Sequence, residues 1–340
     1  MCEILAFTGG KESPGKTCLA LNTAVTLGKM GAKVLLLDMN VSVANVGTAL
    51  GLQPLHTLND LVWGYCSPEE VIVPWGHNVS LMALGEPVGW SGKDKMSQLL
   101  SMARLLDQHH FILIDTPAGE TASLGPFLAG VPHVLAVVTP EDVASAEATA
   151  FITALHRIAL GKHIFMILNK VPVPEIAEAM SNRLEHDLGK ILGVPSTCLG
   201  YVPDESLMFS ALQQRLPLVV MAPESETTFC FTHLARTVVE IWGAQPHEAG
   251  SESFLRDLFV SLQNDKALSS ILQGETKPGE GFQEAASEEV ELFRQIIFDA
   301  LDPNKANSLD FATMYQHVRE VVQTFRKDSP MVERVPSPSA

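Results

Sequence analysis

Short apolar runs alternate with helix-length stretches along the first 243 residues of the chain. The runs cover 4–7, 34–37, 79–84, 111–114, 134–138 and 164–168, and a last one precedes Tyr201. Each has the length of a buried strand and falls well short of the roughly 18 apolar residues that a membrane span needs. The stretches between them, for example 16–30, 96–108 and 144–160, have the length of helices. This alternation predicts an α/β fold with a doubly wound, mostly parallel sheet.

The pattern changes after a last helix that we predict at 227–242. Residues 244–252 contain Pro, Gly and Ser and predict a linker, so we place the first domain at 1–243. From 253 to 328 the apolar positions follow helical spacing alone, which predicts an all-helical C-terminal appendage. Its apolar faces lie at 254–262, 292–301 and 314–325. The final 329–340 is rich in Pro and Ser and predicts a disordered tail.

Composition narrows the class of protein. With 340 residues and 46% hydrophobic content, the chain has ample material for a buried core. A net charge of -16 argues against direct nucleic-acid binding, which needs a positive field along the phosphates. The five cysteines are scattered, so they indicate neither a zinc site nor a disulfide framework. Met1 leads straight into a strand without a signal-peptide pattern, so we expect a cytoplasmic protein.

The segment from Gly10 to Thr17 fits G-x-x-x-x-G-K-[ST], the phosphate-binding loop, between a predicted strand and a predicted helix. In such a loop, backbone N–H groups and the following helix N-terminus surround phosphate oxygens. A lysine reaches the β- and γ-phosphates and a hydroxyl ligates Mg²⁺, roles that Lys16 and Thr17 can fill. The candidate nucleotide-binding residues are Gly10, Lys11, Gly15, Lys16, Thr17 and Cys18.

The loop also carries a second lysine, Lys11, and K-E-S-P-G-K-T at 11–17 resembles the deviant phosphate loop of the MinD/ParA group of P-loop ATPases. Residues 38–61 are similar to a run found in the FlhG (FleN, YlxH) branch of that group, which regulates flagellar number and placement. Later segments resemble the group's strand ends in the expected order: 111–119, 138–141, 168–171 and 202–204. The resemblance covers about residues 3–243.

The resemblance implies ATP and Mg²⁺ as cofactors and a homodimer that forms when ATP is bound. Lys11 would reach the phosphates of the opposite subunit, so Lys11 and Lys16 would both be catalytic. Asp115 would hold the Mg²⁺ shell together with Thr17, and Gly119 would sense the γ-phosphate. Asn169 and Pro203 would contact adenine, although Asn169 could equally be an ordinary turn residue.

Three departures from the group's pattern bear on ATP hydrolysis. Glu12 and Ser13 replace two glycines, which restricts the backbone and places a carboxylate near the phosphates. Asn40 replaces the second aspartate of a D-x-D pattern whose first aspartate, Asp38, is present, and Asn40 cannot accept a proton from the attacking water. Asp38 stays available to contact Mg²⁺-bound water, and Asn40 can still position water by hydrogen bonding. We therefore expect a weak ATPase.

The predicted function is an ATP-controlled switch that regulates the position or number of a cellular assembly, as a flagellum regulator does. The alternative is a non-hydrolysing scaffold that acts through protein contacts alone. Residues 253–328 would bind a protein partner. Membrane contact is not favoured, because Glu252, Asp257 and Asp265 flank the apolar face at 254–262 and would repel anionic lipids. The alternative to a purely cytoplasmic location is a peripheral position at a cell pole or membrane.

Overall fold

The computed structural model describes residues 2–10, 15–40, 46–52, 54–87, 89–119, 121–159, 162–193, 196–243 and 250–263. An eight-stranded sheet in the order β3-β4-β2-β5-β1-β6-β7-β8 forms the centre of this described part. The strands are β1 (Glu3–Gly9), β2 (Val34–Asp38), β3 (Val73–Gly76), β4 (Val79–Ala83), β5 (Phe111–Asp115), β6 (His133–Val138), β7 (Ile164–Val171) and β8 (Thr197–Pro203). Neighbouring strands run parallel except at the β3–β4 edge. The predicted mostly parallel α/β sheet is confirmed.

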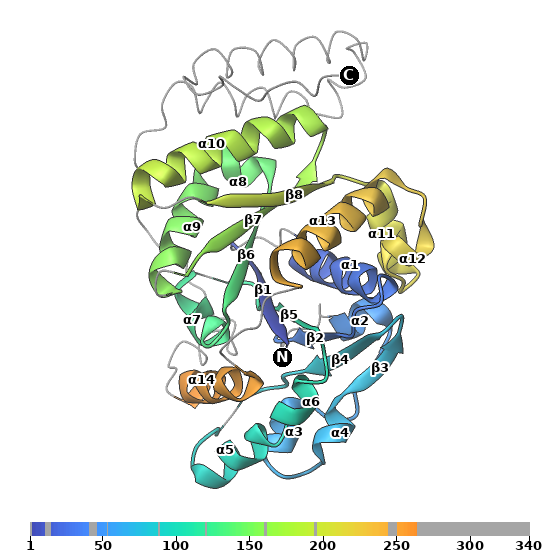
Figure 1. Ribbon diagram of the computed structural model, residues 1–340, viewed down its shortest axis with the longest axis vertical. Coiled ribbons are helices and arrows are strands. Elements are labelled where there is room, and N and C mark those ends of the chain that lie inside the picture. The colour runs from blue at the N-terminus through green and yellow to red at the C-terminus, as the bar shows by residue number, and fades with distance from the viewer. Residues whose placement is uncertain are drawn as a thin grey trace.

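Helices cover both faces of the sheet, as Figure 1 shows. One face carries α1 (Lys16–Lys29), α2 (Val46–Leu50), α11 (Ser206–Gln213), α12 (Leu218–Met221) and α13 (Glu226–Trp242). The other carries α3 (Leu58–Val62), α4 (Pro68–Val71), α5 (Lys93–Leu100), α6 (Ala103–Leu106), the 3-10 turn Thr121–Leu124, α7 (Gly125–Leu128), α8 (Pro140–Ala144), α9 (Glu147–Ile158), α10 (Pro174–Leu192) and α14 (Ser251–Gln263).

The central strand β1 shows why this sequence makes a two-sided core. Successive side chains of a strand point to opposite faces. Ile4 and Ala6 therefore enter the core under α9, α10 and α14, while Leu5 and Phe7 enter the core under α1 and α13. All four are at most 2% exposed. A strand buried on both faces reads as a continuous apolar run, which is the pattern that predicted it.

Two predicted helices are each divided in the structure. The stretch 96–108 forms α5 and α6, and the stretch 144–160 forms the end of α8 and then α9. Ala146, between α8 and α9, has a φ of 60°, a left-handed conformation that interrupts the helical hydrogen-bond ladder. The strand β3 was not predicted, because its four residues include Pro74, which lacks an N–H donor.

The first helix of the C-terminal region packs on the domain that precedes it. Helix α14, drawn in orange in Figure 1, begins at Ser251, inside the predicted linker. It packs against α5, α6 and α7. Its apolar residues Phe254, Leu255, Leu258, Phe259 and Leu262 are at most 4% exposed. Gly130 permits this close approach, because a Cβ there would lie 3.0 Å from the Cα of Phe254. The later predicted helices at 292–301 and 314–325 and the tail at 329–340 lie outside the described residues.

Candidate functional site

The parallel strands bring their carboxyl ends to one edge of the sheet, where α/β folds bind ligands. Asp38 ends β2 and Asp115 ends β5, and the two residues are direct neighbours in the parallel register. Phe7 of β1 is the neighbour of Asp115 on its other side. The chain leaves β1 at Gly9, and the two described ends of the phosphate-loop motif, Gly10 and residues 15–17, also lie at this edge.

Lys16 and Thr17 open helix α1 at this edge. The Thr17 hydroxyl donates a hydrogen bond of 2.6 Å to Asp115 Oδ2. Lys16 is only 3% exposed, and burial lowers the pKa of its ammonium while Asp115 partly offsets that shift. Lys16 and Thr17 of the motif thus form a largely buried cluster with the strand-end carboxylate of Asp115, which lies 98 positions after Thr17 in the sequence.

Asp115 is fully buried, and its Oδ1 atom has no hydrogen-bond partner. Burial raises the pKa of Asp115 to about 7, and the carboxylate of Asp38 adds to the rise. Thr17 and Lys16 act in the opposite direction without cancelling it. A buried carboxylate oxygen without a donor is costly, so this atom has unused capacity for a cation.

Asp38 binds backbone N–H groups with both carboxylate oxygens. Its Oδ1 accepts from the N–H of Asn40 at 2.9 Å, and its Oδ2 accepts from the N–H of Val46, the first residue of α2, at 2.8 Å. Burial raises the pKa of Asp38 to about 6 in spite of these bonds. This role as an anchor for the chain on both sides of 41–45 was not predicted. The Asp38 carboxylate accepts a hydrogen bond from the N-terminus of α2, a short helix that the sequence pattern did not predict.

Gly15 and Asn169 are in direct contact, although 154 positions separate them in the sequence. Gly15 has a φ of 84°, and a Cβ at this position would lie 2.5 Å from Nδ2 of Asn169. Asn169 is 7% exposed near the end of β7. The structure therefore places Asn169 against the phosphate-loop motif, as a packed residue at the carboxyl edge.

The remaining predicted residues lie at or near the same edge. Gly10 follows β1, Pro203 ends β8, and Gly119 follows β5 with its Cα close to the Ser123 hydroxyl. Burial raises the pKa of the Cys18 thiol to about 11, with help from Asp115, so this thiol is neutral near pH 7. Lys11, Glu12 and Ser13 lie outside the described residues.

Two polar residues at this edge were missed by sequence reasoning. Thr116, fully buried after Asp115, donates from its hydroxyl to the Phe7 carbonyl at 3.0 Å. Asn22, on α1, donates to the Cys18 carbonyl at 2.8 Å and accepts from the Val219 N–H at 3.1 Å. A polar residue on the apolar face of a predicted helix was the available signal for Asn22, because buried amides need partners.

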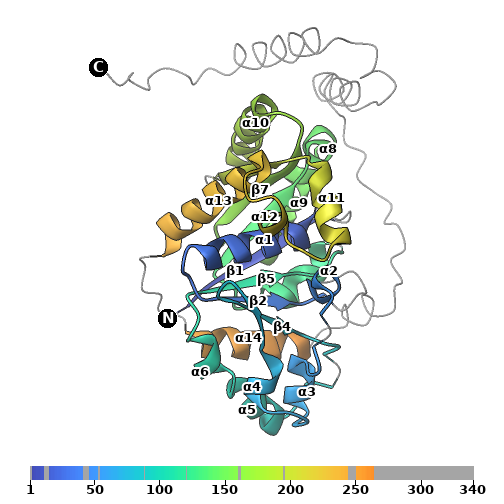
Figure 2. The same ribbon diagram turned by 90° about the vertical axis from the view of Figure 1, so that its right-hand side faces the viewer.

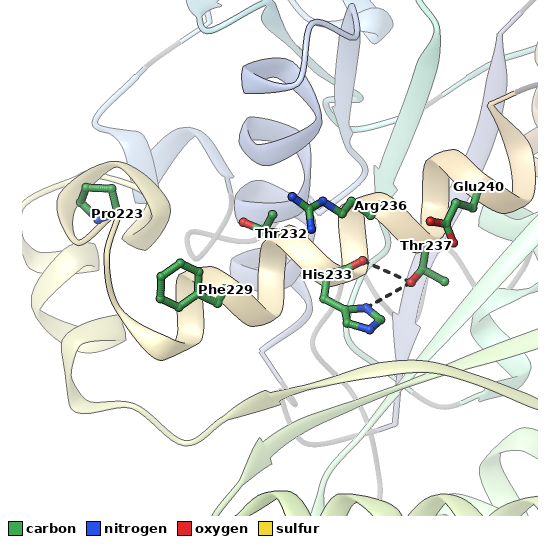
Figure 3. Close-up of a pocket in the computed structure, with 7 residues that line it drawn as sticks. All are labelled: Pro223, Phe229, Thr232, His233, Arg236, Thr237 and Glu240. Atoms are coloured by element: carbon green, nitrogen blue, oxygen red, sulfur yellow. Dashed lines mark hydrogen bonds between the residues drawn. The ribbon is translucent and has the colours of Figure 1, made fainter. Parts of the chain in front are cut away.

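A separate surface groove of about 560 Å³ runs along α13 and shares no residue with the cluster at the carboxyl edge. Its lining residues are Pro223, Phe229, Thr232, His233, Arg236, Thr237 and Glu240 (Figure 3). Within it, the Thr237 hydroxyl lies 3.3 Å from Nδ1 of His233 and donates to the His233 carbonyl at 3.2 Å. These bonds lie within one helix and build no cluster of converging groups, so size alone does not make this groove the functional site.

The fold and the edge cluster define the class of protein: a P-loop NTPase. A family model described as ParA, NUBPL iron-transfer P-loop NTPase, matches residues 1–239. The chain belongs to this family. All five cysteines are free, and none of the helices in the described part is long and apolar enough to cross a membrane.

Comparisons with individual proteins point to the MinD and FleN members of the wider group. The chain is 27% identical over 262 residues to the antiactivator FleN of Pseudomonas aeruginosa, which covers 76% of this chain and 93% of FleN. It is 29% identical over 241 residues to the septum site-determining protein MinD of Synechocystis, which covers 69% of this chain and 89% of that MinD. The resemblance found in the sequence is confirmed.

Solved MinD structures share the fold. The cell division ATPase MinD of Pyrococcus furiosus matches with a TM-score of 0.54 and 25% identity, covering 71% of this chain and 100% of that one. MinD of Pyrococcus horikoshii, solved with Mg-ADP, matches with a TM-score of 0.54 and 25% identity over 72% of this chain and 98% of that one.

Proposed function

We propose that this protein is an ATP-binding switch of the MinD type. The observation that carries the proposal is the cluster of buried Lys16, half-buried Thr17 and buried Asp115 at the carboxyl edge of the sheet. These residues come from the G-x-x-x-x-G-K-T motif and from a strand end, and they have the chemistry that phosphate and a divalent cation require. MinD of P. horikoshii, a structural relative, was solved with Mg-ADP.

The residues present fit a magnesium ion. Mg²⁺ prefers oxygen ligands and keeps several waters. The Thr17 hydroxyl and the unpartnered Oδ1 of Asp115 supply protein oxygens on one side, and Lys16 supplies positive charge for the phosphates. Bound Mg²⁺ would neutralise phosphate charge and polarise the phosphoryl oxygens. Lys16 and the α1 N-terminus would orient the phosphates. The ion would also give the buried Oδ1 of Asp115 the partner that it lacks.

Hydrolysis in this site would be slow. Asn40 cannot accept a proton, and both oxygens of Asp38 already accept backbone N–H groups. Asn40 then offers no general base, and Asp38 is committed to holding the backbone, so catalysis would rest mainly on water positioned by hydrogen bonds. The non-hydrolysing scaffold receives no specific support from the cluster, because a protein that never binds nucleotide gains nothing from burying Lys16 beside Asp115.

The biological role that we propose is regulation of the position or number of a cellular assembly. The named relatives are an antiactivator and septum site-determining proteins. An ATP-bound homodimer, with Lys11 reaching the phosphates of the second subunit, would present a different surface from the monomer and so change partner binding. Residues 253–328 would contribute a partner-binding element, and the protein would work in the cytoplasm, or at the periphery of a pole or membrane.

Calorimetry with ATP and Mg²⁺, together with mass determination by light scattering in ATP and in ADP, tests the proposal. We expect ATP binding and an increase in mass with ATP alone. Lys16→Ala should weaken ATP binding by at least about 10-fold, because a charge-assisted hydrogen bond is lost. The matched control is Lys95→Ala, a lysine whose ammonium lies over the Trp63 ring and bonds the Gly89 carbonyl, outside the cluster of Lys16, Thr17 and Asp115. Absence of binding at millimolar ATP would refute the switch.

A further inference from the structure

Two aromatic rings form an exposed platform between α3 and α4. Trp63 caps the C-terminus of α3, and Tyr65 follows it after Gly64, whose φ of 77° turns the chain. The two rings are stacked, with an interplanar angle of 16° and centroids 6.4 Å apart. Trp63 is 42% exposed and Tyr65 is 70% exposed. Large apolar side chains that gather on a surface mark interaction sites, whereas single ones do not.

The platform is held in place by the structure beneath it. The Lys95 ammonium lies 3.2 Å from the centroid of the Trp63 ring and donates to the Gly89 carbonyl at 2.6 Å. Within α3, the side-chain oxygen of Asn59 accepts from the indole N–H of Trp90 at 2.9 Å. Trp90 is itself only 2% exposed. Rings that are fixed before binding lose little conformational freedom when another group packs on them.

The chain leaves the described structure close to this platform. Phe259 of α14 stacks on Trp90, with ring centroids 5.9 Å apart. The neighbouring Gly89 lies against the platform, since a Cβ there would be 3.1 Å from Cζ2 of Trp63. Figures 1 and 2 both show α14 beside α3, α4 and α5 at one end of the fold. Helix α14 ends at Gln263, about one turn after Phe259, so the sequence that follows starts near the platform.

We propose that the tail at 329–340 docks on the platform of Trp63 and Tyr65 in the same chain. The tail contains Pro330, Pro336 and Pro338. Proline-rich segments favour the extended polyproline II conformation, and they are recognised by exposed aromatic side chains. The tail therefore has the chemistry that two stacked, solvent-facing rings bind.

The length of chain between Gln263 and the tail allows this docking. An extended chain covers about 3.3 Å per residue and a helix about 1.5 Å per residue. Residues 264–335 therefore reach the platform even if the helices that we predict at 292–301 and 314–325 both form. Reach does not limit the contact.

Charge favours the tail over a second copy of the chain as the occupant. The whole chain carries a net charge of -16, so two copies repel one another. Glu69 and Glu70 are exposed on α4, shortly after Tyr65. Basic side chains lie in the tail and just before it: Arg326, Lys327 and Arg334. A tethered segment with these cations is attracted to an acidic surface that a second copy would avoid.

Trypsin cleavage after Arg334, in the middle of the tail, tests the proposal. Mass spectrometry follows the release of residues 335–340 from the full chain and from a synthetic peptide of residues 329–340. The ratio of the peptide rate to the full-chain rate gives a protection factor. A flexible tether provides an effective concentration of about 1 mM, so an intrinsic Kd of about 0.2 mM predicts protection of about 6-fold.

Loss of one platform ring should remove the protection. In Tyr65→Ser the cleavage rate should come within about 2-fold of the peptide rate, because an aromatic anchor is lost. The matched control is Phe209→Ser, which removes another exposed ring, 66% exposed, on α11. Its protection factor should equal that of the wild type. Thermal unfolding checks that both variants are folded.

Substitutions in the tail test the other side of the contact. The joint change Pro336→Ser and Pro338→Ser should abolish protection, measured against a peptide with the same two substitutions. Pro278→Ser changes a proline outside the tail and serves as the matched control, with the protection of the wild type expected.

Each other outcome overturns the docking. A wild-type tail that is cleaved as fast as the peptide leaves the platform open to a different partner. Protection that survives in Tyr65→Ser places the tail elsewhere on the protein, and protection that grows with protein concentration identifies a second copy as the occupant. Tyr65 lies outside the cluster of Lys16, Thr17 and Asp115, so ATP binding should be unchanged in Tyr65→Ser and the proposed switch is tested separately.

Discussion

Asp115→Asn is expected to stabilise the nucleotide-free protein while it weakens binding of Mg²⁺ and ATP. The wild-type carboxylate is fully buried, lies beside Asp38 and has one oxygen without a donor. Asparagine keeps nearly the same shape, and its side-chain oxygen can still accept the hydrogen bond from Thr17. The variant therefore removes a buried negative charge with little change in packing.

The pKa of Asp115 sets the magnitude. Its value of about 7 in the folded protein compares with 3.8 for the free side chain. A carboxyl whose pKa is raised by folding holds its proton in the folded state over a range where the unfolded chain is ionised. Wild-type stability must then fall as the pH rises between about 4 and 7. The penalty amounts to about 4 kcal/mol at pH 8 and less than about 1 kcal/mol at pH 4.

Removing this penalty raises the free energy of unfolding of the Asp115→Asn variant, but part of the increase is offset. The asparagine amide brings N–H donors into a fully buried site, which costs about 1 to 3 kcal/mol if they find no partner. We expect a net stabilisation of about 1 to 3 kcal/mol at pH 8. The difference between the variant and the wild type should also grow by about 3 kcal/mol from pH 4 to pH 8, because the amide offset does not titrate.

Urea unfolding at several pH values, without nucleotide or divalent cations, measures this difference. Asp94→Asn, an exposed aspartate at the start of α5, is the matched control and should change stability by less than about 1 kcal/mol. Calorimetry should show weaker binding of ATP with Mg²⁺ to the Asp115 variant. A variant that is no more stable than the wild type at pH 8, or a difference that is flat with pH, would refute the reasoning.

Three further predictions follow from the geometry. Gly15→Ala should lower the free energy of unfolding by about 1 to 2 kcal/mol because Gly15 has a left-handed φ. It should also weaken ATP binding at least 10-fold, since the new Cβ would lie 2.5 Å from Nδ2 of Asn169. Gly31→Ala, at a φ of 96° with open space around it, should show the stability cost in urea unfolding but no change of ATP binding in calorimetry. Gly130→Ala should speed hydrogen exchange in α14 at least 10-fold, because the new Cβ would lie 2.9 Å from the Cβ of Asp257 in that helix. Gly193→Ala, at a site with open space, should leave exchange in α14 unchanged. Asn40→Asp should raise phosphate release with ATP by at least 10-fold, and an unchanged rate would show that this position alone does not limit hydrolysis.

Strands and the phosphate-loop helix could be predicted because their signals are local. Val34 to Asp38 is an apolar run with one polar end, and such a run buried on both faces is stable only in a covered parallel sheet. Lys16 and Thr17 were assigned from the motif, whose glycine is required by the observed φ of 84° at Gly15. In each case the residues that carry the signal lie next to one another in the sequence.

Contacts between distant segments could not be predicted in this way. The hydrogen bond from Thr17 to Asp115, and the approach of Asn169 to Gly15, depend on which strand ends become neighbours. The break between α8 and α9 at Ala146 carries no Gly or Pro that would predict it. Tertiary packing rather than local preference imposes the left-handed φ of Ala146. These features followed only from the assembled sheet.

The last described helices, α13 and α14, are held at the edge of the sheet opposite the carboxyl edge, and this bears on where a partner could bind. Trp242, the last residue of α13, packs against His133 and Phe165 at the amino ends of β6 and β7. Ser251, the first residue of α14, lies with its hydroxyl 3.0 Å from the Cys2 thiol beside the start of β1. Helix α14 is thus anchored to the opposite edge of the sheet, and it contributes its apolar face to the core there. A partner held near the start of α14 would then lie at the edge opposite Lys16, Thr17 and Asp115, so it would leave the nucleotide cluster accessible.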